Sequence, residues 1–241
     1  MLSESLRKER IDRKKEQTSW HISSIGMCPA GVFHQRKGIE PEFTDRQLRI
    51  FRQGEQTELF VKNLLGKYLV EYQPRVEYPD MNLTGYADFI VEDERGFRLI
   101  ECKSQNSKAF WWREKRGGNA SEHHVIQTSL YWNQLKEKYK GLEASVLYVS
   151  KDDLCMVEIP LLEETLREGI AEGFSETAKL NEAWEKGKPP FPTQLIINEG
   201  TWRVNWKASF CPVHHICTND PDWKEKAKLM AQDANKEESY A

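Results

Sequence analysis

The stretch that decides the fold runs from Gly85 to Lys103 and reads GYADFIVEDERGFRLIECK. Two apolar segments flank the turn-forming run Glu92–Gly96, which is the pattern of a β-hairpin. On such paired strands Asp88 and Glu101 can converge at the strand ends. Side chains alternate along a strand, so Glu101 and Lys103 point to the same face. The hairpin therefore predicts two carboxylates and a lysine at one place.

Two carboxylates at one place repel each other and need a cation. Hard oxygen ligands favour Mg²⁺ or Mn²⁺. A lysine beside such an ion can orient a water molecule and stabilise charge that grows on a phosphoryl oxygen. The alternative is a surface hairpin whose charges are merely solvated. However, Glu101 directly follows the apolar pair Leu99 and Ile100, and a charge inside a strand usually has a reason. These residues favour metal-assisted phosphodiester hydrolysis.

The segments around the hairpin alternate between helical and β patterns. Apolar periodicity predicts helices within residues 44–69, 121–138 and 162–186. A second hairpin is predicted from SVLYVS at 145–150 and LCMVEIP at 154–160. This order is typical of an α/β domain with a mixed central β-sheet flanked by helices. The expected organisation is a charged arm at 1–19, a core at 20–187, a C-terminal appendage packed on it at 188–221 and a charged tail at 222–241.

Composition narrows the class of protein. The chain has 241 residues, 39% hydrophobic and 11% aromatic, so most of it is expected to fold. Its apolar runs fall far short of the ~20 residues that span a bilayer, and its N-terminus lacks the apolar core of a signal peptide. We therefore expect a cytoplasmic protein with no membrane partner. The net charge of −3 leaves DNA binding open, because a DNA enzyme needs only a locally basic groove.

Three further features support a nuclease. Gln127 and Tyr131 lie four apart on one face of a predicted helix, and Glu58 places another carboxylate on the helix before the strands. Between strand and helix lies FWWREKRGGN, residues 110–119, in which aromatic residues stand beside basic ones. The candidate DNA-binding residues are Trp111, Trp112, Arg113, Lys115 and Arg116. Aromatics that stack on bases beside cations that hold phosphates suit a single-strand channel, whereas the alternative is a buried Trp pair under an ordinary loop.

These motifs, in this order, resemble the RecB-like branch of the PD-(D/E)XK nuclease superfamily. The resemblance rests on Gly54 to Glu58, Asp88, Glu101-Cys-Lys103 and Gln127 to Tyr131. It implies a restriction-endonuclease-like core. It also implies that Asp88 and Glu101 bind Mg²⁺ or Mn²⁺ together with the Cys102 main-chain carbonyl, and that Glu58 completes the shell. Lys103 would then position the attacking water, and Gln127 and Tyr131 would help to place DNA.

The cysteines narrow the resemblance to the CRISPR-associated four-cysteine exonucleases and their phage-encoded relatives. That family holds a [4Fe–4S] cluster through one cysteine before the core and three after it. Cys28, Cys211 and Cys217 match three of these places, but the fourth is Ala208. A cluster on three thiolates, a Zn²⁺ site completed by His214 or His215, and loss of the metal are all left open.

The resemblance implies a metal-dependent DNA nuclease, most readily an exonuclease on single-stranded DNA or DNA ends. It would serve CRISPR adaptation or phage recombination, with an integrase or recombinase as a partner. Two alternatives stay open. One is a non-catalytic DNA-binding module on the same fold, which retention of Asp88, Glu101 and Lys103 together argues against. The other is a structure-specific endonuclease.

Overall fold

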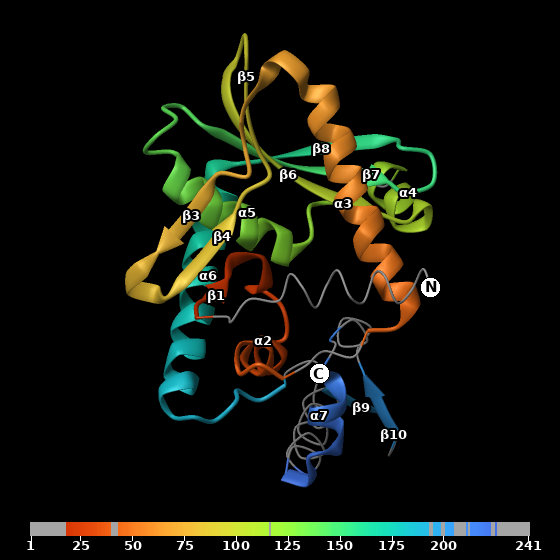
Figure 1. Ribbon diagram of the computed structural model, residues 1–241, viewed down its shortest axis with the longest axis vertical. Coiled ribbons are helices and arrows are strands. Elements are labelled where there is room, and N and C mark those ends of the chain that lie inside the picture. The colour runs from red at the N-terminus through yellow and green to blue at the C-terminus, as the bar shows by residue number, and fades with distance from the viewer. Residues whose placement is uncertain are drawn as a thin grey trace, which may run out of the picture. The chain divides into compact units, whose positions relative to one another are not determined.

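The computed structural model describes residues 18–39, 43–115, 117–192, 195–198, 201–204, 211, 213–222 and 225 (Figure 1). The chain divides into two compact units. The first contains Ser19–Gly26 and Thr44–Thr177, and the second contains Met27–Phe43 and the chain from Ala178 onward. Arg116, Ala208 and the N-terminal residues 1–17 lie outside the described residues.

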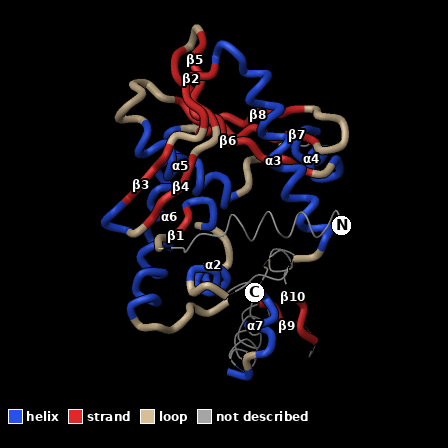
Figure 2. Tube along the Cα trace, in the orientation of Figure 1, coloured by secondary structure: helices blue, strands red, loops and turns tan. Residues whose placement is uncertain are grey.

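A five-stranded mixed sheet forms the centre of the first unit (Figure 2). Its strands, in spatial order, are β2 (Leu69–Tyr72), β5 (Phe89–Asp93), β6 (Gly96–Gln105), β7 (Glu143–Ser150) and β8 (Met156–Leu161). All neighbours are antiparallel except β6 and β7, which run parallel. Both predicted hairpins are confirmed, and the mixed α/β fold class is as expected from the sequence.

One face of this sheet packs against α3 (Asp45–Leu65). A capping box starts the helix, in which the Thr44 hydroxyl accepts from the Gln47 backbone N–H and the Gln47 side chain accepts from the Thr44 N–H. Helix α3 inserts Val61 into a cluster with Phe89 and Ile100 of the sheet. Because side chains alternate along β6, residues Leu99, Glu101 and Lys103 point to the opposite face.

That opposite face is covered by α4 (Ser107–Lys115) and α5 (Glu122–Leu135), and α6 (Glu163–Glu185) follows β8. Phe110 of α4 packs on Val146 and Tyr148 of β7. The sequence predicts a loop over residues 110–119, so α4 is a correction. Asn106 explains it, because its side-chain oxygen accepts from the Ala109 N–H at 2.9 Å and caps the helix.

A smaller sheet of three strands, in the order β1-β4-β3, belongs to the same unit. It contains β1 (Trp20–His21), β3 (Arg75–Tyr78) and β4 (Leu83–Tyr86), with the 3₁₀ turns η1 (Ile22–Ser24), η2 (Gly66–Tyr68) and η3 (Pro79–Met81) nearby in the chain. Gly85 lies inside β4. A Cβ there would come within 2.9 Å of the Tyr131 ring, so the glycine allows α5 to approach the strand closely.

The second unit contains α2 (Pro29–Arg36), β9 (Leu195–Asn198), β10 (Thr201–Val204) and α7 (His214–Asn219). Phe33 of α2 packs against Trp184 at the end of α6, and the Arg36 guanidinium lies over the same indole ring at 4.4 Å. Within the described ranges, every helix is too short or too polar to cross a bilayer.

Candidate active site

The β5–β6 pairing brings the two predicted carboxylates together. Phe89 pairs with Ile100 in antiparallel register, which places Asp88 opposite Glu101 one step further along. The Cys102 N–H donates to Oδ2 of Asp88 at 2.7 Å, so a backbone group of β6 fixes that carboxylate. The convergence expected from the sequence is therefore present.

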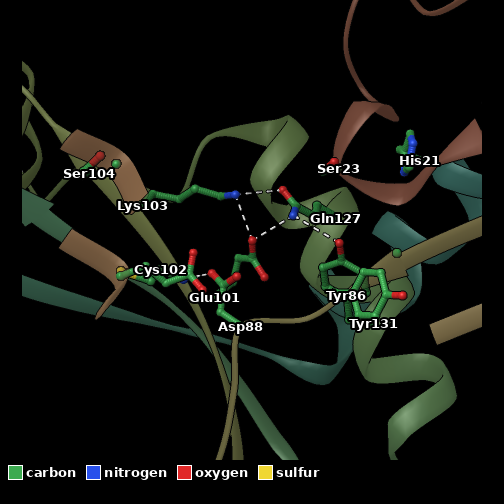
Figure 3. Close-up of a pocket in the computed structure, with 13 residues that line it drawn as sticks. His21, Ser23, Tyr86, Asp88, Glu101, Cys102, Lys103, Ser104, Gln127 and Tyr131 are labelled. Carbon is green, nitrogen blue, oxygen red and sulfur yellow. Dashed lines mark hydrogen bonds and ion pairs between the residues drawn. The ribbon is translucent and has the colours of Figure 1, made fainter. Parts of the chain in front are cut away.

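Lys103 and Gln127 hold Glu101 from two sides. The Lys103 ammonium donates to Oε1 of Glu101 at 2.8 Å and to Oε1 of Gln127 at 2.9 Å. The Gln127 amide in turn donates to Oε1 of Glu101 at 2.7 Å and to the Tyr131 hydroxyl at 3.4 Å. Figure 3 shows these side chains gathered around Glu101. Gln127 and Tyr131, one turn apart on α5, thus belong to one hydrogen-bond network around Glu101.

Burial sets the electrostatics of this network. It raises the pKa of Asp88 well above its usual range, and the Glu101 carboxylate raises it further. Burial also raises the pKa of Glu101, against the lowering effect of Lys103. Burial alone would lower the pKa of Lys103, but Glu101 and Asp88 outweigh it and raise the value. Two buried carboxylates thus share one lysine cation, and a second cation would let both ionise.

The network forms the floor of a pocket of about 460 Å³, a volume typical of small-ligand sites. Its lining residues come entirely from the first unit: His21, Ser23, Gly54, Glu58, Gly85, Tyr86, Asp88, Glu101, Cys102, Lys103, Ser104, Gln127 and Tyr131. The seven residues expected around the metal and catalytic site are thus all present in it.

The carboxylates suit a hard divalent cation. Oε2 of Glu101 is buried and accepts from no amide, ammonium or hydroxyl group among the described residues, so its neighbour is the Asp88 carboxyl, whose proton a metal ion would replace. Oε1 of Glu58 instead accepts from the Tyr72 hydroxyl at 3.0 Å and from the Gln73 amide at 2.9 Å. Across the part of the chain that is described, no group of three His, Cys, Asp or Glu residues is arranged to hold a metal ion. Two carboxylates with water and phosphate oxygens are nevertheless a common Mg²⁺ environment.

Four of the five predicted DNA-binding residues, Trp111, Trp112, Arg113 and Lys115, lie on α4, outside the pocket lining. Trp111 and Trp112 are 47% and 44% exposed and contact each other edge to face, which excludes the alternative of a buried pair. Arg113 instead makes internal contacts. It donates to Gln105 at 3.2 Å and to the Asn119 carbonyl, and its guanidinium lies 3.7 Å from the centre of the Tyr148 ring.

The three candidate cysteines gather in the second unit. Cys28 directly precedes α2, and a Cβ on Gly31 would lie 2.8 Å from the Cys211 sulfur and 3.8 Å from the Cys28 Cβ. Burial raises the pKa of Cys217 to about 12, with further contributions from Cys28 and Cys211. Gly31 therefore lies between Cys28 and Cys211, and a side chain at this position would crowd the Cys211 sulfur. Cys102 and Cys155 lie in the first unit.

The pocket also contains residues that the sequence arguments did not select, chiefly His21, Ser23 and Tyr86. One available signal was the alternation in Trp20-His-Ile-Ser23, in which large apolar residues alternate with polar ones. Only the pairing of β1 with β4, however, brings this segment to the pocket.

Comparisons with known proteins agree with this geometry. The family model described as the PD-(D/E)XK nuclease superfamily matches residues 6–218. The crystal structure of SSO0001 aligns with a TM-score of 0.53 and 19% identity, covering 90% of this chain and 94% of that one. An alkaline exonuclease from Laribacter hongkongensis aligns with a TM-score of 0.50 and 15% identity, covering 71% and 92%. No curated protein matches the chain in sequence.

Proposed function

The chain belongs to the PD-(D/E)XK nuclease superfamily, and from that premise we propose that it is a divalent-metal-dependent exonuclease acting on single-stranded DNA or DNA ends. The observation that carries this proposal is the pair of adjacent carboxylates, the half-buried Asp88 and the buried Glu101, with Lys103 at the floor of an open pocket. A purely structural ion pair would not need a second carboxylate whose pKa is raised by burial and by its neighbour.

Asp88 and Glu101 are the residues that would hold Mg²⁺ or Mn²⁺, with the Cys102 main-chain carbonyl as a further oxygen ligand. When bound, such an ion supplies a Lewis acid that lowers the pKa of a water molecule and neutralises phosphate charge. Glu58 lies in the same pocket and would complete the shell through its Oε2, because its Oε1 is already bonded.

Lys103 would place the attacking water in line with the phosphorus. Its ammonium is held between Glu101 and Gln127, so its direction is fixed before substrate arrives. The same positive charge lies where charge accumulates on a phosphoryl oxygen during attack. Gln127 orients both Lys103 and Glu101, and Tyr131 supports Gln127.

Trp111 and Trp112 of α4 would stack on the bases of a single strand, with Lys115 holding phosphate beside them. Their exposure supports this role, since exposed tryptophans of this size are uncommon without a partner. Arg113, with its internal contacts, would support α4 and the turn that follows it. By the family resemblance, the protein would act with an integrase or recombinase in CRISPR adaptation or phage recombination.

The decisive experiment is incubation with end-labelled single-stranded and double-stranded DNA, each with Mg²⁺, Mn²⁺ or EDTA. Stepwise shortening of one labelled strand that requires the metal supports the proposal. Binding without cleavage would instead indicate the non-catalytic DNA-binding module. Internal cuts at junctions or flaps would indicate a structure-specific endonuclease.

We also propose that Cys28, Cys211 and Cys217 hold an iron–sulfur cluster through three thiolates. Two sulfurs that share one zinc ion can be no more than about 4.6 Å apart, given a Zn–S distance of ~2.3 Å. The support for the cluster is the resemblance to the four-cysteine exonucleases, three of whose cysteine places are matched by Cys28, Cys211 and Cys217. When bound, the cluster would tie the segment before α2 to the segment before α7.

Metal analysis of anaerobically purified protein tests this assignment without reference to activity. We expect a brown protein that contains iron, with colour and iron lost in Cys28→Ser or Cys211→Ser. Cys155→Ser is the matched control, because that thiol is exposed and belongs to the other unit. Zinc alone, or neither metal, would overturn the cluster.

A further inference from the structure

One wall of the catalytic pocket is not accounted for by the nuclease residues. It contains His21 and Ser23 from the N-terminal segment and Tyr86 from β4. Figure 3 shows His21 and Ser23 on the side of the pocket away from Ser104. These side chains contribute nothing to the network around Glu101, so another role is needed for them.

The pairing of β1 with β4 explains how this wall forms. The two strands run parallel, with Trp20 beside Leu83 and His21 beside Thr84. Trp20 and Leu83 are fully buried, so this face of the small sheet belongs to the core. Alternation then turns His21 and Tyr86 to the open face, where Tyr86 is 58% exposed.

The wall is held in place by the protein itself. The Trp20 N–H donates to the Asn82 carbonyl at 2.8 Å, and the Ser19 and Thr84 hydroxyls are hydrogen-bonded at 2.8 Å. Just beyond Ser23, the Gly26 N–H donates to the Glu176 carboxylate at 2.7 Å. A ligand that reaches this wall therefore meets a surface that is already formed, which lowers the entropy cost of binding.

The chemistry of the wall suits one nucleotide. Tyr86 offers an exposed aromatic face, on which a base can stack. Ser23 offers a hydroxyl, and partial burial lowers the pKa of His21, so that its neutral ring offers one N–H donor. The side chains of His21 and Ser23 make no hydrogen bond to another described residue, and a phosphate would supply acceptors for both.

We propose that Tyr86, His21 and Ser23 form a subsite for one unpaired nucleotide next to the scissile phosphate. Tyr86 carries the base, and His21 with Ser23 binds the adjoining phosphate. A base inside a duplex is stacked on both sides and cannot take this position, so the subsite selects single-stranded ends. The inference rests on the proposed nuclease function, which places the scissile phosphate at Asp88 and Glu101.

The first arm of the test concerns the base. Affinity is measured by fluorescence anisotropy in Ca²⁺, an oxygen-binding cation, with a labelled single strand and with strands that are abasic on either side of the first linkage. Tyr86→Ala is expected to weaken binding of the intact strand by roughly 5- to 140-fold, the range that one base stack provides. On the abasic strand the same substitution is expected to have little effect.

Two control variants test whether Tyr86→Ala weakens binding merely by disturbing the fold. Tyr86→Phe keeps the ring and is expected to retain the affinity of the wild type. Tyr68→Ala removes another exposed tyrosine of the first unit that does not line the pocket, so its binding is expected to be unchanged.

The second arm concerns the phosphate. An uncharged methylphosphonate replaces each linkage that adjoins the scissile one, and binding is compared between the wild type and His21→Ala with Ser23→Ala. Hydrogen bonds to a charged group predict a loss of about 10-fold or more from either change. The two losses are expected to overlap, because both changes remove the same contact.

In each arm, the protein change and the DNA change are coupled if the second adds little to the loss of affinity caused by the first. Coupling in both arms supports the subsite, whereas additive losses in either arm overturn it. The cleavage assay distinguishes this result from the fate of the nuclease proposal. Cleavage without coupling would leave the nuclease standing and remove the subsite. Coupling without cleavage would leave the subsite standing and remove the nuclease.

Discussion

The carboxylate site (Asp88, Glu101 and Lys103) and the cysteine site (Cys28, Cys211 and Cys217) both bring together groups that repel one another when they ionise, and they differ in how that charge is compensated. Each gathers groups that can become negative, and at the carboxylate site a cation, Lys103, pairs with one of them. Lys103 lies 2.8 Å from Glu101 and compensates one of the two carboxylates. At the cysteine site burial raises the pKa of Cys211 and Cys217, so these thiols stay protonated until a metal displaces the protons.

This difference predicts different dependence on metal. The carboxylate site keeps its geometry without an ion, because Lys103, Gln127 and the Cys102 N–H already hold both carboxylates. The cysteine site has thiols as its polar groups, and thiols are weak hydrogen-bonding partners. We therefore expect metal to serve catalysis at the first site and stability at the second.

The largest expected effect comes from removing a carboxylate. Asp88→Asn or Glu101→Gln should lower kcat at least about 10³-fold, since each loses several kcal/mol of metal-dependent charge stabilisation. Thermal unfolding should change little or shift upward for Asp88→Asn, because a buried like-charge pair is relieved. Asp80→Asn is a surface control. Near-wild-type turnover by Asp88→Asn would contradict the assignment of the site.

The next effect tests the internal cation. Lys103→Met should lower kcat about 10²- to 10³-fold. In EDTA it should also cost about 3–5 kcal/mol of unfolding free energy, because Glu101, only 1% exposed, loses its one charged partner among the described residues and keeps only the neutral amide of Gln127. Mn²⁺ should recover part of that stability, as measured by denaturant unfolding. Lys138→Met removes the exposed partner of Glu71 and should cost at most about 1 kcal/mol.

Substitutions of the exposed tryptophans on α4 should weaken the binding of single-stranded DNA without changing catalysis or metal content. Trp111→Ala and Trp112→Ala are each expected to weaken binding of a single strand by about 1–3 kcal/mol, with kcat on a saturating substrate retained. Stability should hold, because both indoles are nearly half exposed. Leu162→Ala, an exposed apolar residue elsewhere, is the control. Unchanged affinity in the double variant would remove these tryptophans from the binding surface.

The smallest effect concerns the cysteine site. Gly31→Ala adds a Cβ at 2.8 Å from the Cys211 sulfur, so it should cost up to about 2 kcal/mol despite the gain in helix propensity, and it should reduce metal content. Gly54→Ala is the matched change in α3, where the new Cβ lies 3.5 Å from the Ser104 hydroxyl. That variant should gain roughly 0.5–1 kcal/mol. Normal metal content in Gly31→Ala would show that the glycine is not needed for metal binding by the cysteines.

The sequence predicted the site best where its residues lie close together in the chain. Asp88 and Glu101 belong to one hairpin, and the turn that ends in Gly96 at φ 112° sets their register. Gln127 and Tyr131 lie one turn apart on a single helix. Local periodicity is enough to place such groups on one face.

Prediction from the sequence was less successful where the structure depends on a contact between distant segments or on a single capping side chain. Helix α4 was missed because its aromatic and basic residues carry little amphipathic pattern, and Asn106 supplies the capping bond. His21 and Tyr86 become neighbours only through a parallel pairing between segments far apart in the chain. Periodicity cannot reveal such a pairing, because both partners look like ordinary short strands.

The placement of Lys103 two residues after Glu101 also has a consequence for the order of folding. Hairpins form in about 1–10 μs, before elements that need a long crossover can arrive. The β5–β6 hairpin therefore brings Asp88 and Glu101 together while α5 and its Gln127 are still unplaced. A lysine on the same strand arrives together with the repelling pair. We therefore expect Lys103 to lower the cost of closing its own hairpin before it takes any part in catalysis.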